Sequence, residues 1–272
     1  MTTPTRQLFV DRRRDGAWSH PEDAVAVEEP LEIRVAGDTV AITMRTPGHD
    51  RELALGFLFA EGLIRSIDDV SSVAHCGRTT DEGRLNTIDV TPAPGVRIVL
   101  GHDEPFSRRG TISSACGVCG RRSIDDLLAR CTPVASDGPV ALRHLLGAAQ
   151  ELRILQPLFN ETGGCHGAGL FTRTGDPIEV FEDVGRHNAV DKLIGSQLLE
   201  HTLPLTSRVL VVSGRTSFEI VQKAAVAGIP IVAGVSAPSS LAVDVATRAG
   251  ITLVGFVRGE SLVVYTGRER IA

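Results

Sequence analysis

Two cysteines stand two residues apart in a stretch rich in glycine and arginine, residues 113–123, which read SSACGVCGRRS. Thiols at this spacing serve three kinds of chemistry: half of a zinc site, a redox pair, or a nucleophile that carries a group. A tetrahedral zinc site needs four ligands, and Cys116 and Cys119 supply only two of them. Cys165 and His166 are the residues that could complete the set, so a structural zinc site stays open.

Deaminase and thioredoxin chemistry fit the pattern poorly. Zinc deaminases combine His-x-Glu with a later Cys-x-x-Cys, whereas here His166 precedes Gly167 and Ala168 and follows the paired cysteines. A thioredoxin-like pair would follow a strand near the start of a compact βαβ domain, but a long β-rich segment precedes these thiols. Both classes are therefore disfavoured.

The neighbours of the two thiols favour a carrier role. A helix predicted to start at Ser123 and four nearby arginines both stabilise a thiolate, the nucleophilic form of cysteine. Gly117 and Gly120 favour a flexible loop. We expect such a thiolate to take sulfur from a persulfide and present it elsewhere, with the second cysteine as relay or resolving thiol. The opposing interpretation is that both are ordinary loop residues. The arginines are Arg108, Arg109, Arg121 and Arg122.

Two further loops follow predicted strands and precede predicted helices, where free backbone N–H groups bind anions. The first contains Ser213, Gly214 and Arg215, and the second, one strand–helix unit later, begins at Ser236. Together they predict a cradle for a phosphorylated ligand. The alternative is ordinary N-capping by serine and threonine. Neither loop has a Walker A or GxGxxG sequence, which disfavours a nucleoside triphosphatase or a dehydrogenase.

Two polar clusters flank the hairpin predicted over residues 168–182. Residues 160–166 read NETGGCH, and residues 182–188 read EDVGRHN and open a helix. So many functional side chains beside glycines favour a binding role over simple turn chemistry. For His187 the alternative is a helix-start residue, and for His166 it is a hydrogen-bonded core histidine.

Composition narrows the class of protein. The chain has 272 residues, 42% of them hydrophobic, which can bury a large core in one domain or two smaller ones. It has neither an 18-residue apolar run nor a signal-like N-terminus, so we expect a cytoplasmic protein with no membrane contact. Five cysteines, an odd number, favour reduced thiols, and Cys76 and Cys131, which lie in no motif, are assigned to packing. The net charge of −5 disfavours a nucleic-acid binder.

The first hundred residues predict a β-rich region with one helix. Residues 22–46 alternate apolar and polar side chains around a Gly37-Asp38 turn, which indicates a hairpin. Apolar spacing predicts a helix over residues 51–64, with Asp50 as its N-cap. Two short strands are expected near residues 71–75 and 87–99.

The rest of the chain alternates strands with helices. This order predicts βαβ units and a largely parallel sheet with right-handed crossovers. We therefore expect an α/β fold with a β-rich N-terminal region, residues 1–120, ending in the CxxC loop, and an α/β domain, residues 121–272. The boundary between them is soft, within 105–140. Helices are expected over residues 140–155, 187–201, 217–228 and 240–250, and strands over 208–214, 229–236 and 251–259.

Several long and specific stretches resemble the formate dehydrogenase accessory sulfurtransferases, the FdhD family, over nearly the whole chain. They are EEPLEIRV, MRTPGHDRELALGFLFAEGLI, SSACGVCGRRSI, TGGCHGAGLF, FEDVGRHNAVDKLIG, SGRTSFEIVQKAAVAGIPIVAGVSAPSSLAV and TLVGFVRG. The resemblance implies a cytidine deaminase-like α/β domain with a mostly parallel sheet, a smaller β-rich N-terminal domain, and a homodimer.

The resemblance also implies an activity. A family member accepts sulfur from a cysteine desulfurase as a cysteine persulfide. It then transfers that sulfur to the molybdenum of bis-molybdopterin guanine dinucleotide, the cofactor that formate dehydrogenase requires. On this basis Cys116 holds the persulfide and Cys119 assists. The family's cofactor-binding stretch falls on Phe256, Val257, Arg258, Gly259, Glu260 and Ser261.

The implied cofactor, a bis-dinucleotide, carries two pyrophosphate groups. These groups are the ligand that we expect the loops at Ser213 and Ser236 to bind. We expect Arg215 and Arg258 to bind phosphates, and Glu182, Asp183 and His187 to line the same cavity.

Two alternatives remain. A chaperone that binds the molybdenum cofactor without persulfide chemistry should not need Cys116. A zinc-stabilised hydrolase or deaminase should contain stoichiometric zinc.

Overall fold

The computed structural model describes residues 3–76, 84–99, 112–113, 133–135 and 137–272. Cys116, Cys119 and Cys131 lie outside these described residues, as does the helix expected to start at Ser123. Within the described ranges, no helix is both long and apolar enough to cross a bilayer.

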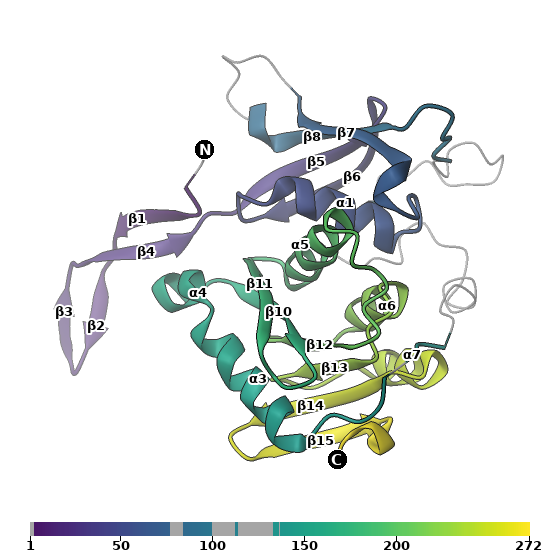
Figure 1. Ribbon diagram of the computed structural model, residues 1–272. Helices are drawn as coiled ribbons and strands as arrows, with labels where there is room; N and C mark the ends of the chain where they lie inside the picture. Colours follow the sequence, from purple (N-terminus) through teal and green to yellow (C-terminus); the bar gives the residue numbers. More distant parts are fainter. Residues whose placement is uncertain (1–2, 77–83, 100–111, 114–132, 136) are drawn as a thin grey trace.

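A five-stranded sheet with the order β7-β8-β5-β6-β9 forms one layer of the molecule (Figure 1). The predicted hairpin is confirmed over residues 29–45, because β5 and β6 pair antiparallel around a turn in which Ala36 and Gly37 have positive φ, whereas residues 22–26 pair with residues 5–9 instead. Leu31 and Ile33 of β5 are fully buried. The elements are β5 Glu29–Val35, β6 Asp38–Arg45, η1 Ile67–Asp69, β7 Val70–His75, η2 Arg84–Asn86, β8 Thr87–Pro92 and β9 Ile112–Ser113.

Helix α1, Asp50–Ala60, follows this hairpin. The expectation that Asp50 caps the helix is wrong, since His49 occupies the N-cap position with a φ of 57° and makes no side-chain cap. Asp50 is instead the first helical residue. Its Oδ1 accepts a hydrogen bond of 2.9 Å from Nε of Arg45, whose side chain is fully buried. A buried guanidinium requires a paired carboxylate, and this requirement outweighs capping.

A six-stranded sheet with the order β11-β10-β12-β13-β14-β15 forms the second layer. Only β12, β13 and β14 run parallel, so the expectation of a mostly parallel sheet is wrong outside these three strands. The outer pairs β10–β11 and β14–β15 are joined by short turns, which impose antiparallel pairing. The strands are β10 His166–Thr172, β11 Pro177–Asp183, β12 Arg208–Val212, β13 Ile231–Gly234, β14 Thr252–Arg258 and β15 Ser261–Thr266.

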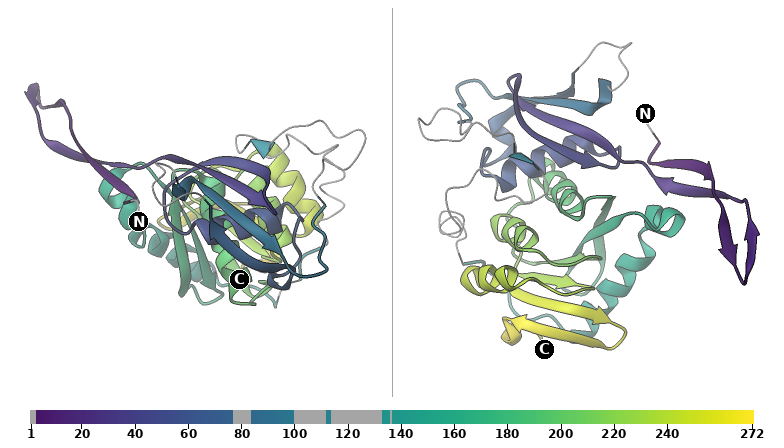
Figure 2. Two further views of the ribbon diagram at one scale, coloured as in Figure 1. Left: turned by 90° about the horizontal axis from the view of Figure 1, so that it is seen from above. Right: turned by 180° about the vertical axis from the view of Figure 1, so that it is seen from behind.

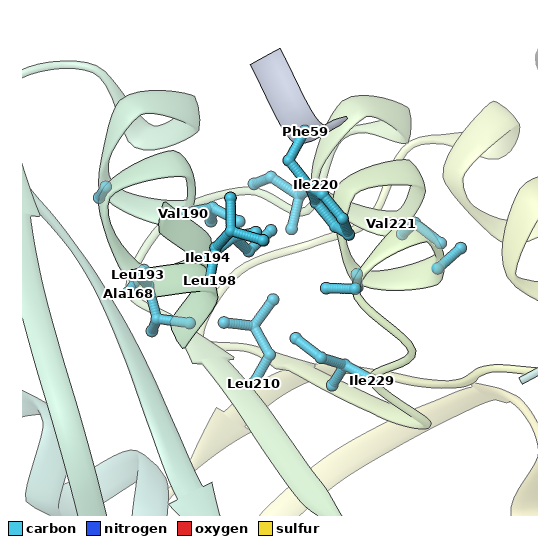
Figure 3. Close-up of a cluster of buried hydrophobic side chains, with 14 of the residues drawn as sticks. Phe59, Ala168, Val190, Leu193, Ile194, Leu198, Leu210, Ile220, Val221 and Ile229 are labelled. Carbon is cyan, nitrogen blue, oxygen red and sulfur yellow. The ribbon is translucent and has the colours of Figure 1, made fainter. Parts of the chain in front are cut away.

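Helices cover both faces of the six-stranded sheet (Figure 2). Leu145 and Leu152 of α3 pack on one face, whereas α5, α6 and α7 cover the other. The second face carries the main core, which includes Leu193, Leu210 and Ile220 (Figure 3). The helices are α3 Leu142–Ile154, α4 Pro157–Thr162, α5 Arg186–Leu199, α6 Phe218–Val226, α7 Ser240–Ala249 and η4 Arg268–Arg270.

Helices α1 and α5 cross with their backbones in contact. A β-carbon at Gly56 would overlap the carbonyl oxygen of Asp191, and one at Gly195 would overlap that of Glu52. Only glycine permits this approach. The main core also contains side chains from both sheets, including Leu31 and Leu210. The two layers are therefore packed together, and the division near residues 105–140 stays a prediction.

The N-terminal residues form a narrow two-stranded ribbon that projects from the body (Figures 1 and 2). Strand β1 pairs antiparallel with β4, and β2 pairs antiparallel with β3 at the distal end. Neither β1 nor the β2–β3 pair is predicted from the sequence, because RRRDGAWSHPED has no clean apolar alternation. The strands are β1 Thr5–Phe9, β2 Arg12–Arg14, β3 Ala17–Ser19 and β4 Glu22–Ala26.

Candidate functional site

The two predicted loops lie side by side at the carboxyl ends of β12 and β13. The backbone N–H of Thr216 donates to the carbonyl of Ala237 at 3.1 Å, and that of Ser239 donates to Thr216 at 3.0 Å. The N–H of Phe256 donates to the carbonyl of Ser236 at 3.2 Å, which brings the end of β14 to the same edge. The sheet therefore collects three strand ends where anions bind in open α/β sheets.

Positive charge gathers at this edge without a counter-ion among the described residues. Arg215 is exposed and Arg186 is half-buried, and neither forms an ion pair with a described residue. The Nε of Arg186 and the Oγ1 of the fully buried Thr216 have no hydrogen-bond partner within the described structure. Buried polar groups are almost always satisfied, so these two atoms are candidates for contacts with a ligand.

Gly214 opens the space between these side chains. A β-carbon at Gly214 would lie 3.1 Å from Nδ1 of His166 and 3.8 Å from Cδ of Arg186. Burial lowers the pKa of His166, and the charges of Arg186 and Arg215 lower it further. The ring of His166 is therefore neutral at pH 7, and an anion bound here would relieve the excess positive charge.

His187, at the start of α5, is held at both ring nitrogens. Its Nδ1 lies 3.0 Å from Oε2 of Glu219, and its Nε2 lies 2.8 Å from Oγ of Ser217. Burial lowers the pKa of His187 to about 3, with further contributions from Lys223, Arg186 and His166. Because the ring is neutral, Nδ1–H donates to Glu219 and Nε2 accepts the hydroxyl proton of Ser217.

A small cavity of about 30 Å³ lies beside His187, between α1, α5, α6 and the five-stranded sheet. It is lined by His187, Asp191, Glu219 and Lys223 on its polar side, and by Ile33 among others on its apolar side. Such a volume holds water but no nucleotide.

Two carboxylates expected in the ligand cavity serve the fold instead. Asp183 is fully buried and forms a 2.7 Å ion pair with Lys192. The Oε1 and Oε2 of Glu182 accept hydrogen bonds from the N–H groups of Phe159 and Leu158, at 2.7 and 2.9 Å, at the start of α4. Satisfied carboxylates of this kind have little capacity left for a ligand.

The stretch of residues 256–261 covers the end of β14, the turn at Gly259 and Glu260, and the first residue of β15. Phe256 has a φ of 52°, a strained backbone conformation for an aromatic residue. Its side chain is 40% exposed. Val257 is buried among the apolar side chains on the α3 face of the six-stranded sheet. Arg258 pairs with Ser261, whose Oγ donates to the Arg258 carbonyl at 3.0 Å. The remaining residues of this turn, Gly259 and Glu260, are exposed.

Arg186 and Thr216 lie in stretches that the sequence already singles out, but the sequence assigns neither of them a role of its own. Arg186 stands beside His187 in the cluster EDVGRHN, and Thr216 stands in the first loop. One signal for Arg186 was available in the sequence. The helix that Arg186 begins has no carboxylate three or four residues further on that could pair with it. Thr216 gives no such signal, because its burial depends on tertiary packing.

The two described cysteines differ in their surroundings. Cys165 is buried with Sγ 3.8 Å from Oγ1 of Thr46, and burial raises the pKa of its thiol to about 11. Cys76 is half-buried, with Sγ 3.8 Å from the carbonyl of Ala74. No three His, Cys, Asp or Glu side chains gather around a metal position within the described ranges.

These features define an α/β protein with a positively charged, glycine-lined edge where three strands end. The sequence model of the FdhD/NarQ family matches residues 26–272, and the chain belongs to this family.

Relatives support the assignment over the full length. The sulfur carrier protein FdhD of Anaeromyxobacter dehalogenans strain 2CP-1 is 54% identical over 255 residues, covering 92% of this chain and 88% of the relative. That of Streptomyces coelicolor is 49% identical and covers 98% and 96%. The crystal structure of a formate dehydrogenase accessory protein from Desulfotalea psychrophila superposes with a TM-score of 0.77 at 26% identity, covering 99% of this chain and all of that one.

Proposed function

We propose that the chain is a sulfurtransferase that loads sulfur on Cys116 as a persulfide, with Cys119 assisting. It then delivers the sulfur to the molybdenum of bis-molybdopterin guanine dinucleotide, for formate dehydrogenase. The relatives named sulfur carrier proteins support the sulfur role, and the accessory protein supports the recipient. The observation that carries the cofactor half is the unneutralised pair Arg186 and Arg215 beside the unpartnered Thr216.

The sulfur half follows from the chemistry of the thiols. Cys165 is protonated at neutral pH, which leaves it a poor nucleophile. Cys116 and Cys119 are followed by Arg121 and Arg122, which favour thiolates. The Cys116 thiolate attacks the terminal sulfur of the desulfurase persulfide. One S–S bond breaks and one forms, and the desulfurase cysteine leaves as a thiolate, so no external oxidant is needed.

The strand-end site suits a guanine dinucleotide as substrate. The guanidinium groups of Arg186 and Arg215 form charge-assisted hydrogen bonds with phosphate oxygens. The hydroxyl of Thr216 is free to donate to the same phosphate. The exposed ring of Phe256 at the neighbouring strand end offers an apolar face for a flat base.

Sulfur loading can be tested by intact mass. The reduced protein is incubated with a cysteine desulfurase and cysteine, and we expect one added sulfur that maps to Cys116 or Cys119 and is lost with reductant. Cys116→Ala should abolish loading, whereas the matched Cys76→Ala should load normally. Failure of the wild-type chain to gain mass, where a known acceptor is loaded, would remove the sulfur half of the proposal.

A cofactor chaperone without persulfide chemistry is the second candidate. It needs only the proposed phosphate site, at which Arg186, Arg215 and Thr216 would bind the cofactor without a thiol. Activation of formate dehydrogenase by Cys116→Ala separates the two candidates. Full activation by this variant supports the chaperone, and loss of activation with intact guanine nucleotide binding supports the carrier. Zinc analysis of the purified protein tests the deaminase-like alternative.

A further inference from the structure

Three apolar side chains gather on the outer face of the five-stranded sheet, along β6 and the neighbouring β5. Ile42 and Met44 are 46% and 43% exposed. Their neighbours Ala41 and Thr43 are buried, because successive strand residues point to opposite faces of a sheet. Pro30 of β5 is exposed and is the pairing partner of Met44. We call Pro30, Ile42 and Met44 the β6 patch.

The polar group beside the β6 patch is already paired. Glu32 lies opposite Ile42 in the strand pairing. Its carboxylate accepts a hydrogen bond of 2.8 Å from Nη2 of Arg34 and another from Oγ1 of Thr39. Exposed apolar side chains next to neutralised polar ones are typical of protein–protein contact surfaces. The patch therefore suits a protein partner better than a charged small molecule.

The backbone under the β6 patch is held in place from the inner side of the sheet. Nδ2 of Asn188 donates to the carbonyl of Met44 at 2.7 Å, and Oγ1 of Thr43 donates to Oδ1 of Asn188 at 3.1 Å. Asn188 itself is buried on α5. A surface that is ordered before binding loses little entropy when a partner docks.

The β6 patch lies beside the point from which the chain continues toward Cys116. Strand β9 pairs parallel with β6, and Ser113 is the pairing partner of Ile42. Neighbouring strands are about 4.8 Å apart, and three residues span at most about 11 Å. Cys116 follows Ser113 by three residues. The length of the chain therefore keeps the Cα of Cys116 within about 16 Å of that of Ile42.

We propose that the β6 patch is the docking surface for the protein that donates sulfur to Cys116, which is a cysteine desulfurase in the proposed function on which this inference rests. The donor must bring its persulfide into contact with the Cys116 thiolate. A domain about 30 Å across is wide enough to rest on the patch while its persulfide reaches Cys116. The inner face of the sheet is closed to it, because Leu31 and Ile33 are buried in the main core.

A donor fits the β6 patch better than the recipient of the sulfur does. The donor leaves after each transfer, and a patch of three side chains suits the small contact area of a transient complex. The recipient's cofactor is proposed to bind where β12 and β13 end, in the other sheet (Figure 1). The outer face of the five-stranded sheet points away from that layer, since its inner face shares the main core with it.

Sulfur loading from two kinds of donor tests the proposal. Ile42→Glu/Met44→Glu should raise the dissociation constant for the desulfurase at least 10-fold, measured by biolayer interferometry, and lower the kcat/KM of loading on Cys116 by a similar factor. Inorganic polysulfide needs no docking surface, because the Cys116 thiolate attacks a polysulfide sulfur and a shorter polysulfide anion leaves. The double variant should therefore load from polysulfide as the wild type does.

Two further variants separate docking from folding. The matched control Val263→Glu/Tyr265→Glu replaces two exposed residues of β15, also two positions apart, and should bind the desulfurase as the wild type does. Ile42→Thr/Met44→Thr removes the apolar surface with a residue that favours strands, and should also weaken desulfurase binding. Circular dichroism shows whether each variant is folded.

Equal desulfurase affinity in the wild type and both patch variants would overturn the docking proposal and leave the proposed function intact. A patch variant that binds the desulfurase normally but no longer binds formate dehydrogenase would also overturn it, because the patch would then serve the recipient. A wild-type chain that loads from neither donor would instead contradict the proposed function itself.

Discussion

The two strand-end loops are alike in sequence and differ in what their serines do. Ser239 caps α7, because its Oγ accepts from the N–H of Ala242 at 3.3 Å. Ser217 occupies the same position before α6, yet it makes no side-chain cap and bonds to His187 at 2.8 Å. The second loop therefore stabilises its helix, whereas the first leaves its helix start uncapped.

The difference shows how one motif divides into a structural and a functional copy. Only the loop with the uncapped helix carries the unpaired Arg215 and the unpartnered Thr216. Free N–H groups at a helix start and unneutralised arginines both attract anions. N-capping, the alternative offered by the sequence, is thus correct for one loop and fails for the other.

The largest expected effect is a loss of ligand affinity when the arginines beside the first loop are replaced. Arg186→Ala/Arg215→Ala should weaken binding of a guanine nucleotide by about 10- to 100-fold, because each lost charge-assisted hydrogen bond costs about 1.5 kcal/mol or more when buried and less when exposed. Isothermal titration calorimetry measures the change. Arg143→Ala, on the exposed face of α3, is the control and should bind as the wild type does. Equal affinity in all three proteins would remove the first loop from the ligand site.

Acid should lower the free energy of unfolding through His187, whose ring is hydrogen-bonded to Ser217 of the first loop. The folded-state pKa of His187 lies at about 3, below its unfolded value of about 6.5, so the unfolded chain binds the extra proton between these pH values. Stability contributed by neutral His187 is present above pH 6.5 and is lost as the pH falls. Between pH 7 and pH 5 the loss is about 2 kcal/mol.

Urea unfolding at the two pH values measures this term. The wild-type chain should lose about 2 kcal/mol more than His187→Gln does, each relative to its own stability at pH 7. His201→Asn, at an exposed position, should behave as the wild type does. Identical losses in wild type and His187→Gln would mean that His187 titrates normally and that its hydrogen bonds to Ser217 and Glu219 are weak.

The smallest expected effects come from replacing Ser217 and Ser239, the serines that precede α6 and α7. Ser239→Ala should lower the unfolding free energy by about 1 kcal/mol through the lost cap and leave nucleotide affinity unchanged. Ser217→Ala removes no cap, so its main effect should fall on His187, whose ring resonances and pKa should shift in NMR spectra. Should Ser239→Ala shift the His187 resonances equally, the division of labour between the loops would be wrong.

Much of the fold is readable from the sequence. Alternation predicts the β5–β6 hairpin, and helical spacing predicts α3, α5, α6 and α7 within a few residues. The hairpin predicted over residues 168–182 is confirmed by the antiparallel pair β10–β11, whereas β15 is not predicted, because its pairing with β14 depends on a tight turn at Gly259. The N-cap of α1 is misplaced because Asp50 pairs with the buried Arg45, a contact that the sequence does not reveal.

Only part of the candidate site can be predicted from the sequence, because some of its contacts depend on tertiary packing. Strand–helix alternation brings Arg215 and Ser236 to one edge, since parallel strands end together. The alternation does not reveal that Glu182 accepts hydrogen bonds from the start of α4 or that Asp183 pairs with Lys192, because tertiary packing brings these partners together. Burial also decides the state of Cys165 and His187, and burial is a property of the folded chain.

The backbone contact between Gly56 and Gly195 bears on how the chain can be engineered. Where two helices meet without intervening side chains, there is no layer of rotamers to adjust, and small sliding motions are blocked. Fragments cut between α1 and α5 would each expose a strip of bare helix backbone and half of a shared core. We therefore expect split-protein reporters built at this site to reassemble only when co-expressed, and neither fragment to remain soluble alone.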